Sequence, residues 1–363
     1  MPAQGGSSDN PVPPQKREHV MKKNLAIVAA ATILLVGCTP TETDATPTLV
    51  LVTHDSFALS EGTLEKFTEQ TGIEVEVQAG GDAGELANKL VLTKDSPLGD
   101  VVFGIDNTFA SRVTGADVLL PYVSGDVTDA EAAYLLPDGS GGEYLTPIDS
   151  GDVCINIDHA WFGERGIAEP TSLDDLVKPE YKDLLVVEAA NSSSPGLAFL
   201  LATIVANDEA GEDVWQQYWQ GLIENGVKIA ASWSDAYYVD FSGPSSEGDR
   251  PLVVSYASSP PFEPAGATGV MLDSCFRQTE YAGVIAGTKY EAEAKQLVDF
   301  LFSPTVQNDI PENMYVYPVN SKATLPEGWD QYPVPENPYS IDPAEIDANR
   351  EEWLAVWSAI AQP

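Results

Sequence analysis

The sequence is poor in basic residues. Its 363 residues include 18 Lys and Arg but 56 Asp and Glu, which gives a formal net charge of −38. A surface of this sign repels nucleic acid and anionic lipid headgroups, so we expect neither as a partner, and it attracts cations instead. Acidic composition is also a common adaptation for solubility, so composition alone leaves open whether the charge serves a ligand.

Motifs of the common enzyme classes are also missing. The chain holds no HExxH, GxSxG or P-loop motif and no zinc-type spacing of Cys and His, which leaves those catalytic classes without support. It shows no repeat with a period of about 20 to 50 residues of the kind that solenoids have. The length favours two globular domains, and an apolar content of 43% is enough for a sizeable core.

Cysteine is scarce, and the first of the three ends a hydrophobic run. Residues 21–38 read MKKNLAIVAAATILLVGC, which is typical of a secretory signal peptide rather than a membrane span. With its terminal cysteine the segment resembles the signal of bacterial lipoproteins. We expect Met21 to be the true start, 1–37 to be an upstream extension plus signal peptide, and Cys38 to carry a lipid. An uncleaved anchor is the alternative.

The exported chain would remain strongly acidic. Loss of 1–37 takes away four basic and two acidic residues, so the net charge becomes −40. Residues 38–47 are rich in Thr, Pro and acid, which predicts a flexible tether to the outer face of the cell membrane. Cys154 and Cys275 are predicted to form a disulfide, because two thiols in an exported chain more often pair than stay free. Whether their spacing in the fold allows a bond is left open.

From residue 48 onward, short apolar strands alternate with helical segments. Strands are expected at 48–54, 73–79 and 100–105 and helices at 63–72 and 83–95. A second region predicts helices at 194–208 and 212–226 with a strand within 250–259, and helices again at 291–307 and 343–360. This alternation predicts an α/β fold with parallel βαβ units.

Polar residues follow the first predicted strands. His54 to Phe57, residues 80–85 and residues 104–107 come directly after apolar strands. Ligands of open α/β sheets bind at the carboxyl ends of the strands, so these segments predict the wall of a binding site. A capping turn, in which Asp55 and Ser56 bond to backbone, is the alternative at the first of them.

Seven segments in this order resemble one family. They are THDSFALSEG (53–62), GGDAGELANKL (80–90), DVVFGIDNTF (100–109), SSSPGLAFLL (192–201), WSDAYYVDF (233–241), LVVSYASSPPF (252–262) and IPENMYVYPVN (310–320). Together they resemble the periplasmic thiamine-binding proteins of ABC importers, a branch of the type II solute-binding proteins. The resemblance implies an exported, monomeric binding protein that is not an enzyme, needs no cofactor, and delivers thiamine or its phosphates to an ABC permease.

The resemblance also implies two lobes, each a sheet flanked by helices, with the ligand in the cleft between them. Lobe one would hold 48–149 with about 266–363, and lobe two 150–258. The hinges would lie near 146–154 and 256–266, and the lobes would close over the ligand.

The site residues are carried over from the family one by one. Trp233, Tyr256, Phe262 and Tyr315 are expected to form an aromatic wall that attracts a cationic ring. His54 falls where the family has a wall-forming tyrosine, Asp82 is expected to be the acidic partner of the ligand, and Ser193 to hold its polar end. The chain departs from the family at His54, at Phe262 (for tyrosine) and at Tyr315 (for tryptophan). Core packing for the aromatics and a turn role for Asp82 are the structural alternatives.

Two other functions fit the same fold. Ferric-binding proteins place two adjacent tyrosines on the metal, and Tyr237-Tyr238 invites that interpretation, although no basic cluster lies near the pair. Thiaminase I attacks thiamine with a cleft cysteine, for which Cys154 is the candidate. A disulfide would make that cysteine inert.

Overall fold

The computed structural model describes residues 47–137, 139–208, 211, 214–329, 332 and 334–361. Residues 44–363 form one compact unit. The predicted signal peptide, Cys38 and nearly all of the predicted tether lie outside the described residues, so those three remain predictions.

One sheet has seven strands, in the order β12-β5-β11-β3-β1-β2, with β4 paired to β11. β1 runs parallel to β2 and β3, whereas β11 is antiparallel to β3 and β5. The sheet is therefore mixed, and only one side of it is parallel as predicted. Its strands are β1 (Thr48–Thr53), β2 (Glu74–Ala79), β3 (Val101–Asp106), β4 (Leu119–Leu120), β5 (Thr146–Ser150), β11 (Thr279–Ile285) and β12 (Tyr317–Pro318).

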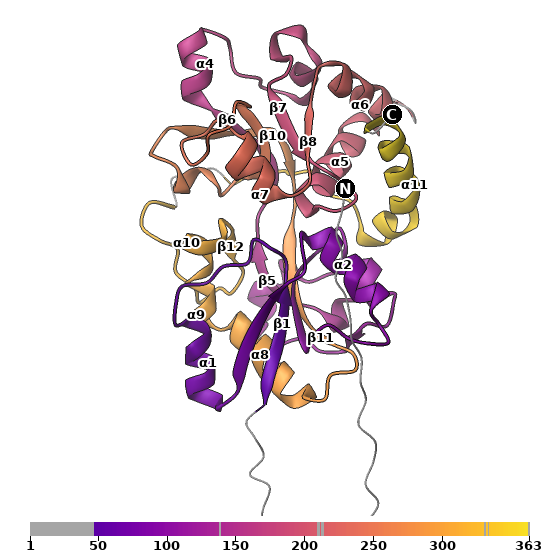
Figure 1. Ribbon diagram of the computed structural model, residues 1–363, viewed down its shortest axis with the longest axis vertical. Helices are drawn as coiled ribbons and strands as arrows, with labels where there is room; N and C mark the ends of the chain where they lie inside the picture. Colours follow the sequence, from indigo (N-terminus) through magenta and orange to yellow (C-terminus); the bar gives the residue numbers. More distant parts are fainter. Residues whose placement is uncertain are drawn as a thin grey trace, which may run out of the picture. The chain divides into compact units, whose positions relative to one another are not determined.

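The second sheet has five strands in the order β10-β6-β9-β7-β8. β7 is parallel to β8 and β9, and β6 is antiparallel to β9 and β10. Its strands are β6 (Val153–Asp158), β7 (Leu185–Glu188), β8 (Lys228–Ala230), β9 (Leu252–Tyr256) and β10 (Thr268–Phe276). We call the seven-stranded sheet with its helices lobe one, and the five-stranded sheet with its helices lobe two (Figure 1).

Helices pack on both sheets. In lobe one they are α1 (Thr63–Thr71), α2 (Ala83–Leu92), α3 (Ala110–Thr114), α8 (Glu291–Phe302), α9 (Pro304–Gln307) and α10 (Ile310–Met314). In lobe two they are α4 (His159–Arg165), α5 (Ser194–Asn207), α6 (Val214–Glu224), α7 (Trp233–Asp235), the π-turn Ala236–Asp240 and α11 (Pro343–Ala361). Short 3-10 turns cover Asp129–Tyr134, Gly142–Tyr144, Leu173–Val177, Pro179–Tyr181 and Pro260–Phe262.

Local sequence signals explain where the first elements begin and end. α1 stops at Gly72, whose φ of 77° is left-handed and suits glycine at a helix end. α5 begins with Ser194 and Pro195 in its first turn, as the sequence predicts, because proline needs no hydrogen-bond partner there. All residues from Ser194 to Thr203 are buried, so α5 is the central helix of lobe two.

The chain crosses between the sheets at 151–152, between β5 and β6, which lies within the predicted hinge 146–154. The predicted second hinge at 256–266 is wrong. β10 still pairs with β6 in lobe two, and the chain crosses only at 277–278, between β10 and β11. The pairing of β10 with a strand about a hundred residues earlier is a tertiary contact that the local pattern does not encode.

The structure also departs from the predicted assignment of about 266–363 to lobe one at the C-terminal helix. α11 lies along α6 of lobe two (Figure 1), where Trp357 meets Trp219 edge to face with ring centroids 5.6 Å apart. Both indoles are fully buried. In the described part of the chain, no helix is long and apolar enough to cross a membrane.

Candidate ligand-binding site

A small cavity lies where the two lobes meet. Four of the predicted site residues line it together: His54, Asp82, Trp233 and Tyr256. His54 and Asp82 follow β1 and β2 of lobe one, whereas Tyr256 ends β9 and Trp233 begins α7 of lobe two. The strand ends of both sheets therefore converge on one hollow, as expected for a ligand site in an open α/β fold.

His54 is held by a carboxylate that the sequence analysis missed. Its Nε2 lies 3.4 Å from Oε2 of Glu280, which also lines the cavity. Burial alone lowers the pKa of His54, but the charge of Glu280, with smaller contributions from Asp82 and Asp55, raises it above its usual value. Glu280 therefore favours protonation of His54, whereas the backbone N–H of Ser56, 3.2 Å from Nδ1, favours the neutral ring.

Glu280 belongs to a pair of buried carboxyl groups. It stands directly opposite Asp149 in the antiparallel ladder of β11 and β5. Both are buried, and in the described part of the chain neither oxygen of Asp149 has a hydrogen-bond partner. Burial, together with repulsion from Glu280, raises the pKa of Asp149 well above its ordinary range. Glu280 thus lines the cavity, and Asp149 lies next to it in the sheet.

Asp82 bridges the lobes through its carboxylate. As the N-cap of α2 it accepts from the backbone N–H of Ala83 at 2.6 Å. It also accepts from the N–H of Ser194 at 3.3 Å and of Trp233 at 3.1 Å, both in lobe two. Burial raises the pKa of Asp82, and the N–H groups of Trp233 and Ala83 oppose the shift. Asp82 lines the cavity, but its oxygens are engaged by backbone.

The start of α5 lies at the interface, but one residue later than predicted. Ser193 is a fully buried N-cap and is not among the described residues that line the cavity, whereas Ser194 and Pro195 are. The Ser194 hydroxyl donates to Asp106 at the end of β3. Burial raises the pKa of Asp106 to about 6, despite that bond. Ser194 thus meets two buried carboxyl groups of lobe one, through its hydroxyl at Asp106 and through its N–H at Asp82.

The aromatic residues form one cluster around Trp233. Its ring lies 6.0 Å from Tyr256, 5.8 Å from Tyr315 and 5.1 Å from Tyr237, on which it stacks. The indole Nε1 donates to the Ser255 hydroxyl at 2.9 Å, which fixes the ring. Such a cluster presents π faces suited to an organic cation.

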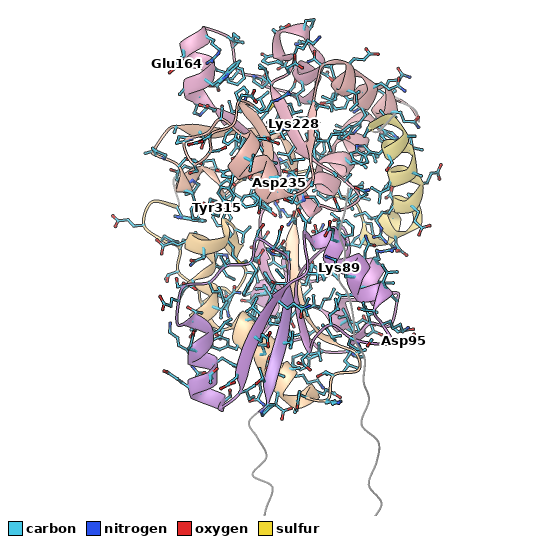
Figure 2. All side chains as sticks on the ribbon, viewed as in Figure 1. Lys89, Asp95, Glu164, Lys228, Asp235 and Tyr315 are labelled. Atoms are coloured by element: carbon cyan, nitrogen blue, oxygen red, sulfur yellow. A yellow bond between two sulfur atoms is a disulfide. The ribbon has the colours of Figure 1, made fainter. Side chains whose placement is uncertain are left out.

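Phe262 and Tyr315 form an outer layer of this cluster. Phe262 stacks on Tyr315 at a centroid distance of 3.5 Å, and neither is among the described residues that line the cavity. Tyr315 adopts a left-handed φ of 64°, and Figure 2 places it where the lobes meet. The next residues on either side of it, Met314 and Val316, reach the cavity instead.

The lobes are closed on each other. Besides the contacts of Asp82 and Ser194, Glu85 N–H donates to the Ser192 carbonyl at 3.1 Å, and Ser56 and Ser234 hydroxyls lie 3.3 Å apart. The enclosed volume is about 20 Å³, enough for about one water molecule. Pockets for organic ligands measure roughly 300 Å³ or more, so the lobes must separate to admit one.

Cys154 and Cys275 are joined in a disulfide between β6 and β10. Both residues are buried. The sulfur of Cys154 is therefore not a free thiol, and a thiolate is what a cysteine nucleophile requires.

The adjacent tyrosines differ in their surroundings. Tyr237 is buried and its hydroxyl donates to Glu263 at 3.1 Å, whereas Tyr238 is 40% exposed. Burial raises the pKa of both phenols, followed by the charge of Glu263 for Tyr237 and a hydrogen bond with Tyr315 for Tyr238. A raised pKa opposes the phenolate form that binds Fe(III). Among the described residues, no group of three or more His, Cys, Asp or Glu side chains is arranged to hold a metal ion.

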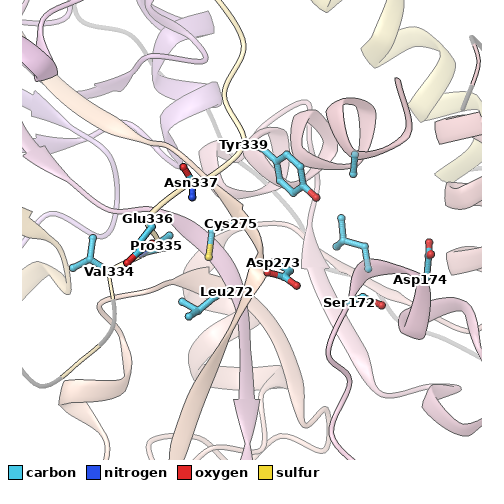
Figure 3. A pocket seen from close by; sticks show the side chains of 12 residues that line it. Ser172, Asp174, Leu272, Asp273, Cys275, Val334, Pro335, Glu336, Asn337 and Tyr339 are labelled. Carbon is cyan, nitrogen blue, oxygen red and sulfur yellow. The ribbon is translucent and has the colours of Figure 1, made fainter. Parts of the chain in front are cut away.

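A larger pocket of about 640 Å³ lies elsewhere in lobe two. It surrounds Cys275, Asp273 and Tyr339 (Figure 3), where the chain returns from β12 toward α11. None of the predicted ligand-binding residues lines it. It is therefore separate from the cavity between the lobes.

The chain belongs to the family of bacterial extracellular solute-binding proteins, whose family model matches residues 96–334. Its role is thus to bind a solute outside the cytoplasm. The match covers all five strands of lobe two, the crossings at 151–152 and 277–278, and five strands of lobe one, which are β3, β4, β5, β11 and β12.

Characterised relatives span nearly the whole chain. The chain is 29% identical to the thiamine-binding periplasmic protein of Escherichia coli over 324 residues, which is 86% of this chain and 93% of that protein. It is 27% identical to the thiamine-binding periplasmic protein of Brucella suis over 348 residues, 92% and 98% of the two chains.

Solved structures show the same fold. A periplasmic thiamin-binding protein superposes with a TM-score of 0.74 at 26% identity and covers 90% of this chain and 100% of its own. The ferric-binding protein of Campylobacter jejuni gives a TM-score of 0.68 at 18% identity, over 86% and 99%. At that identity the second likeness shows the fold alone, which is that of the type II periplasmic binding proteins.

Proposed function

We propose that this protein captures thiamine or a thiamine phosphate outside the cytoplasm and delivers it to an ABC permease. The observation that carries the proposal is the convergence of Trp233, Tyr256 and the carboxylate of Glu280 on one cavity between the lobes. The relatives and the solved structure that span most of the chain are named as thiamine-binding proteins, which supports the same ligand here.

The chemistry of the cavity matches this ligand. Thiamine carries a permanently positive, flat thiazolium ring, and aromatic faces attract such a ring by about 0.5 to 2 kcal/mol each. The carboxylate of Glu280 supplies the opposite charge at a site shielded from water. The net charge of −38 draws cations toward the protein before contact.

Delivery to a permease requires the protein to stay near the membrane. We propose that Cys38 carries the lipid and that residues 38–47 form the tether, so that the binding protein is anchored to the outer face of the cell membrane. Mass spectrometry of the membrane-extracted protein tests this, because an N-terminal fragment beginning at an acylated Cys38 is expected. A fragment that begins upstream of Cys38 would contradict it.

Ferric iron is the second candidate, favoured by the Tyr237–Tyr238 pair and by ferric-binding proteins of the same fold. The buried hydrogen bond of Tyr237 to Glu263 and the raised pKa of both phenols argue against it. Isothermal calorimetry separates the two functions in one panel: thiamine, thiamine monophosphate, thiamine diphosphate and ferric citrate, each titrated into residues 44–363.

We expect one thiamine site with micromolar or tighter affinity, and no heat from ferric citrate. Trp233→Phe should weaken thiamine binding, since phenylalanine offers a smaller π face and no Nε1 donor. Trp161→Phe is the matched control, because Trp161 lies on α4 against Arg165, outside the cavity. A red iron–phenolate absorption band without thiamine heat would reverse the assignment.

A further inference from the structure

The cavity holds a charge arrangement that thiamine capture alone does not explain. His54 at the end of β1, Glu280 on β11 and Asp149 on β5 are all buried, with 3.4 Å between His54 Nε2 and Glu280 Oε2. Glu280 and Asp149 face each other across the β11–β5 ladder. Like charges in this position repel, and a buried pair of carboxyl groups shares one proton.

The contacts decide which carboxyl group keeps the proton. Neither oxygen of Asp149 accepts a hydrogen bond from any residue in the described part of the chain. Glu280, in contrast, receives the side-chain amide of Gln278 on Oε1 at 3.2 Å and faces His54 with Oε2. The negative charge therefore belongs on Glu280, and the proton on Asp149. This agrees with the raised pKa of Asp149.

The His54–Glu280 pair is then neutral when His54 is protonated, because imidazolium and carboxylate cancel. An organic cation that enters the cavity meets a like charge on His54. Asp82 also lines the cavity, but three backbone N–H groups already engage its carboxylate. Glu280 is then left to balance two cations away from water, at a large desolvation cost. Loss of the His54 proton restores neutrality. The neutral imidazole also has a partner ready, because the backbone N–H of Ser56 lies 3.2 Å from Nδ1 and can donate to it.

We propose that the bound cation takes the place of the His54 proton beside Glu280, so that capture of the ligand releases one proton. The inference rests on the proposed function and adds a residue-level mechanism to it. His54 is the exchanging group, and Glu280 is the residue that selects for positive charge.

Other ionisable groups around the pair do not take over this role. The charge of Glu280 acts on Asp106 on β3, but the oxygens of Asp106 accept the hydroxyls of Ser194 and Thr108. Tyr256 on β9 meets the Gln278 amide, and burial raises the pKa of its phenol so that it stays neutral. The charges of Asp82 and Asp55 act on His54 from its own lobe, and the charge of Asp82 acts on the fully buried Glu188.

Calorimetry in buffers of different ionisation enthalpy counts the released protons. Thiamine titrated into residues 44–363 at pH 6 should give an observed heat that varies linearly with buffer enthalpy, with a slope of about one proton. The association constant should fall with falling pH below the raised pKa of His54, by up to about tenfold per pH unit. An analogue with a neutral thiophene ring in place of thiazolium should bind without proton release.

Variants show which residue releases the proton when thiamine binds. His54→Gln should bind thiamine without proton release and with an affinity independent of pH between 5 and 8. Glu280→Gln should lose at least tenfold in thiamine affinity but little for the neutral analogue. Glu263→Gln is the control, a buried carboxylate outside the cavity, and should release protons as the wild type does.

NMR can follow the protonation of His54 directly. Residues 44–363 contain two histidines, His54 and the partly exposed His159, which pairs with Glu169, so two imidazole resonances report by NMR. Saturating thiamine should lower the pKa of His54, and the His159 resonance, which comes from outside the cavity, serves as the internal reference. Thiamine binding with no buffer dependence of the heat and no shift of His54 overturns this inference alone. Absence of binding heat in every buffer overturns the proposed function and this inference with it.

Discussion

At the scale of single residues, two carboxylates at the cavity have different surroundings. The oxygens of Asp82 are taken by three backbone N–H groups, two of them from the other lobe. Glu280 is contacted by the side chains of His54 and Gln278. Backbone N–H groups move only when the lobes move, whereas side chains reorganise in place. Asp82 is thus suited to hold the closed state, and Glu280 to meet a ligand.

Asp82→Asn tests this difference. The asparagine can still accept from Ala83, but its NH₂ group faces a backbone N–H of lobe two and leaves that donor without a partner. A lost buried hydrogen bond costs about 1 to 3 kcal/mol, so closure should weaken and thiamine affinity should fall roughly 5- to 150-fold. Calorimetry should show equal losses for thiamine and for the neutral thiophene analogue.

Asp158→Asn is the matched control, since Asp158 caps α4 in the same way but lies away from the cavity. It should lower stability without changing affinity. If Asp82→Asn weakened the binding of thiamine but not of the neutral analogue, Asp82 would be the carboxylate that pairs with the positive charge of the ligand.

The sequence predicted part of this residue set and missed part of it. Asp82 stands after Gly80-Gly81 at a strand end, which is a local signal. Glu280 stands inside the apolar strand TEYAGVI, where an isolated acid looks like a solvent-facing position. Only the β5–β11 register, which joins strands far apart in the chain, shows that it faces Asp149 in the interior.

At the scale of elements, the hinge is held by contacts between neighbouring strands. The disulfide Cys154–Cys275 joins β6 and β10 close to both crossings. Beside it, Arg277 Nε lies 2.6 Å from Asp152 Oδ1. Gly151 has no room for a side chain, because a Cβ there would lie 2.7 Å from the Tyr256 ring. The crossings at 151–152 and 277–278 therefore lie close together next to the site, and the chain passes to lobe two once more between β12 and α11.

Replacing both cysteines tests the stabilising role of the disulfide. Cys154→Ala with Cys275→Ala removes a link between residues 121 apart, which should lower the free energy of unfolding by about 2 to 5 kcal/mol. Guanidinium unfolding monitored by circular dichroism measures this. Reduction of the wild-type disulfide should give a similar loss. An unchanged unfolding midpoint in both experiments would contradict the prediction.

Most elements were predictable one at a time, because their periodicity and end signals are local. α1, α2, α5, β1 and β3 lie within a few residues of their predicted bounds. The second hinge and the position of α11 were not predictable, because both depend on contacts between segments that are far apart in the sequence. β10 and α11 have apolar faces that could pack against either lobe, and no local sequence signal shows which lobe each of them joins.

At the scale of the whole molecule, buried carboxyl groups with raised pKa accompany a large negative charge. Asp82, Asp106, Asp149, Asp152 and Glu188 all show raised pKa values caused first by burial. Between about pH 4 and 6 the folded protein therefore binds more protons than the unfolded chain. Folding is then favoured as the pH falls through that window, and protonation also relieves repulsion among the surface acids.

The melting temperature should accordingly be higher at pH 5 than at pH 7.5. His54 acts in the same direction, because its raised pKa gives stability below about pH 6.5 that is lost as the pH rises. Glu131 acts oppositely, since hydrogen bonds from Ser321 and Thr128 outweigh its burial and lower its pKa to about 2. Its contribution is lost as the pH falls below about 4.5, so stability should decline again in stronger acid.

Scanning calorimetry at pH 7.5, 5 and 3, each in 0.15 M and 1 M salt (about 8 Å and 3 Å of screening length), measures this dependence. Salt screens the surface charges but not the buried groups, so the rise toward pH 5 should persist in part at high salt. A melting temperature that falls from pH 7.5 to pH 5 would contradict the account.

Ligand capture also requires the whole molecule to open and close. The closed cavity admits about one water molecule, so thiamine must enter an open form and the lobes must close on it. The position that thiamine takes after the lobes close is the central claim.

A crystal structure of residues 44–363 with thiamine tests that claim most directly. The account predicts the thiazolium ring between the lobes, within about 6 Å of the Trp233 ring and adjacent to the Glu280 carboxylate. Thiamine bound outside this cavity, or with its charged ring turned away from both Trp233 and Glu280, would contradict it.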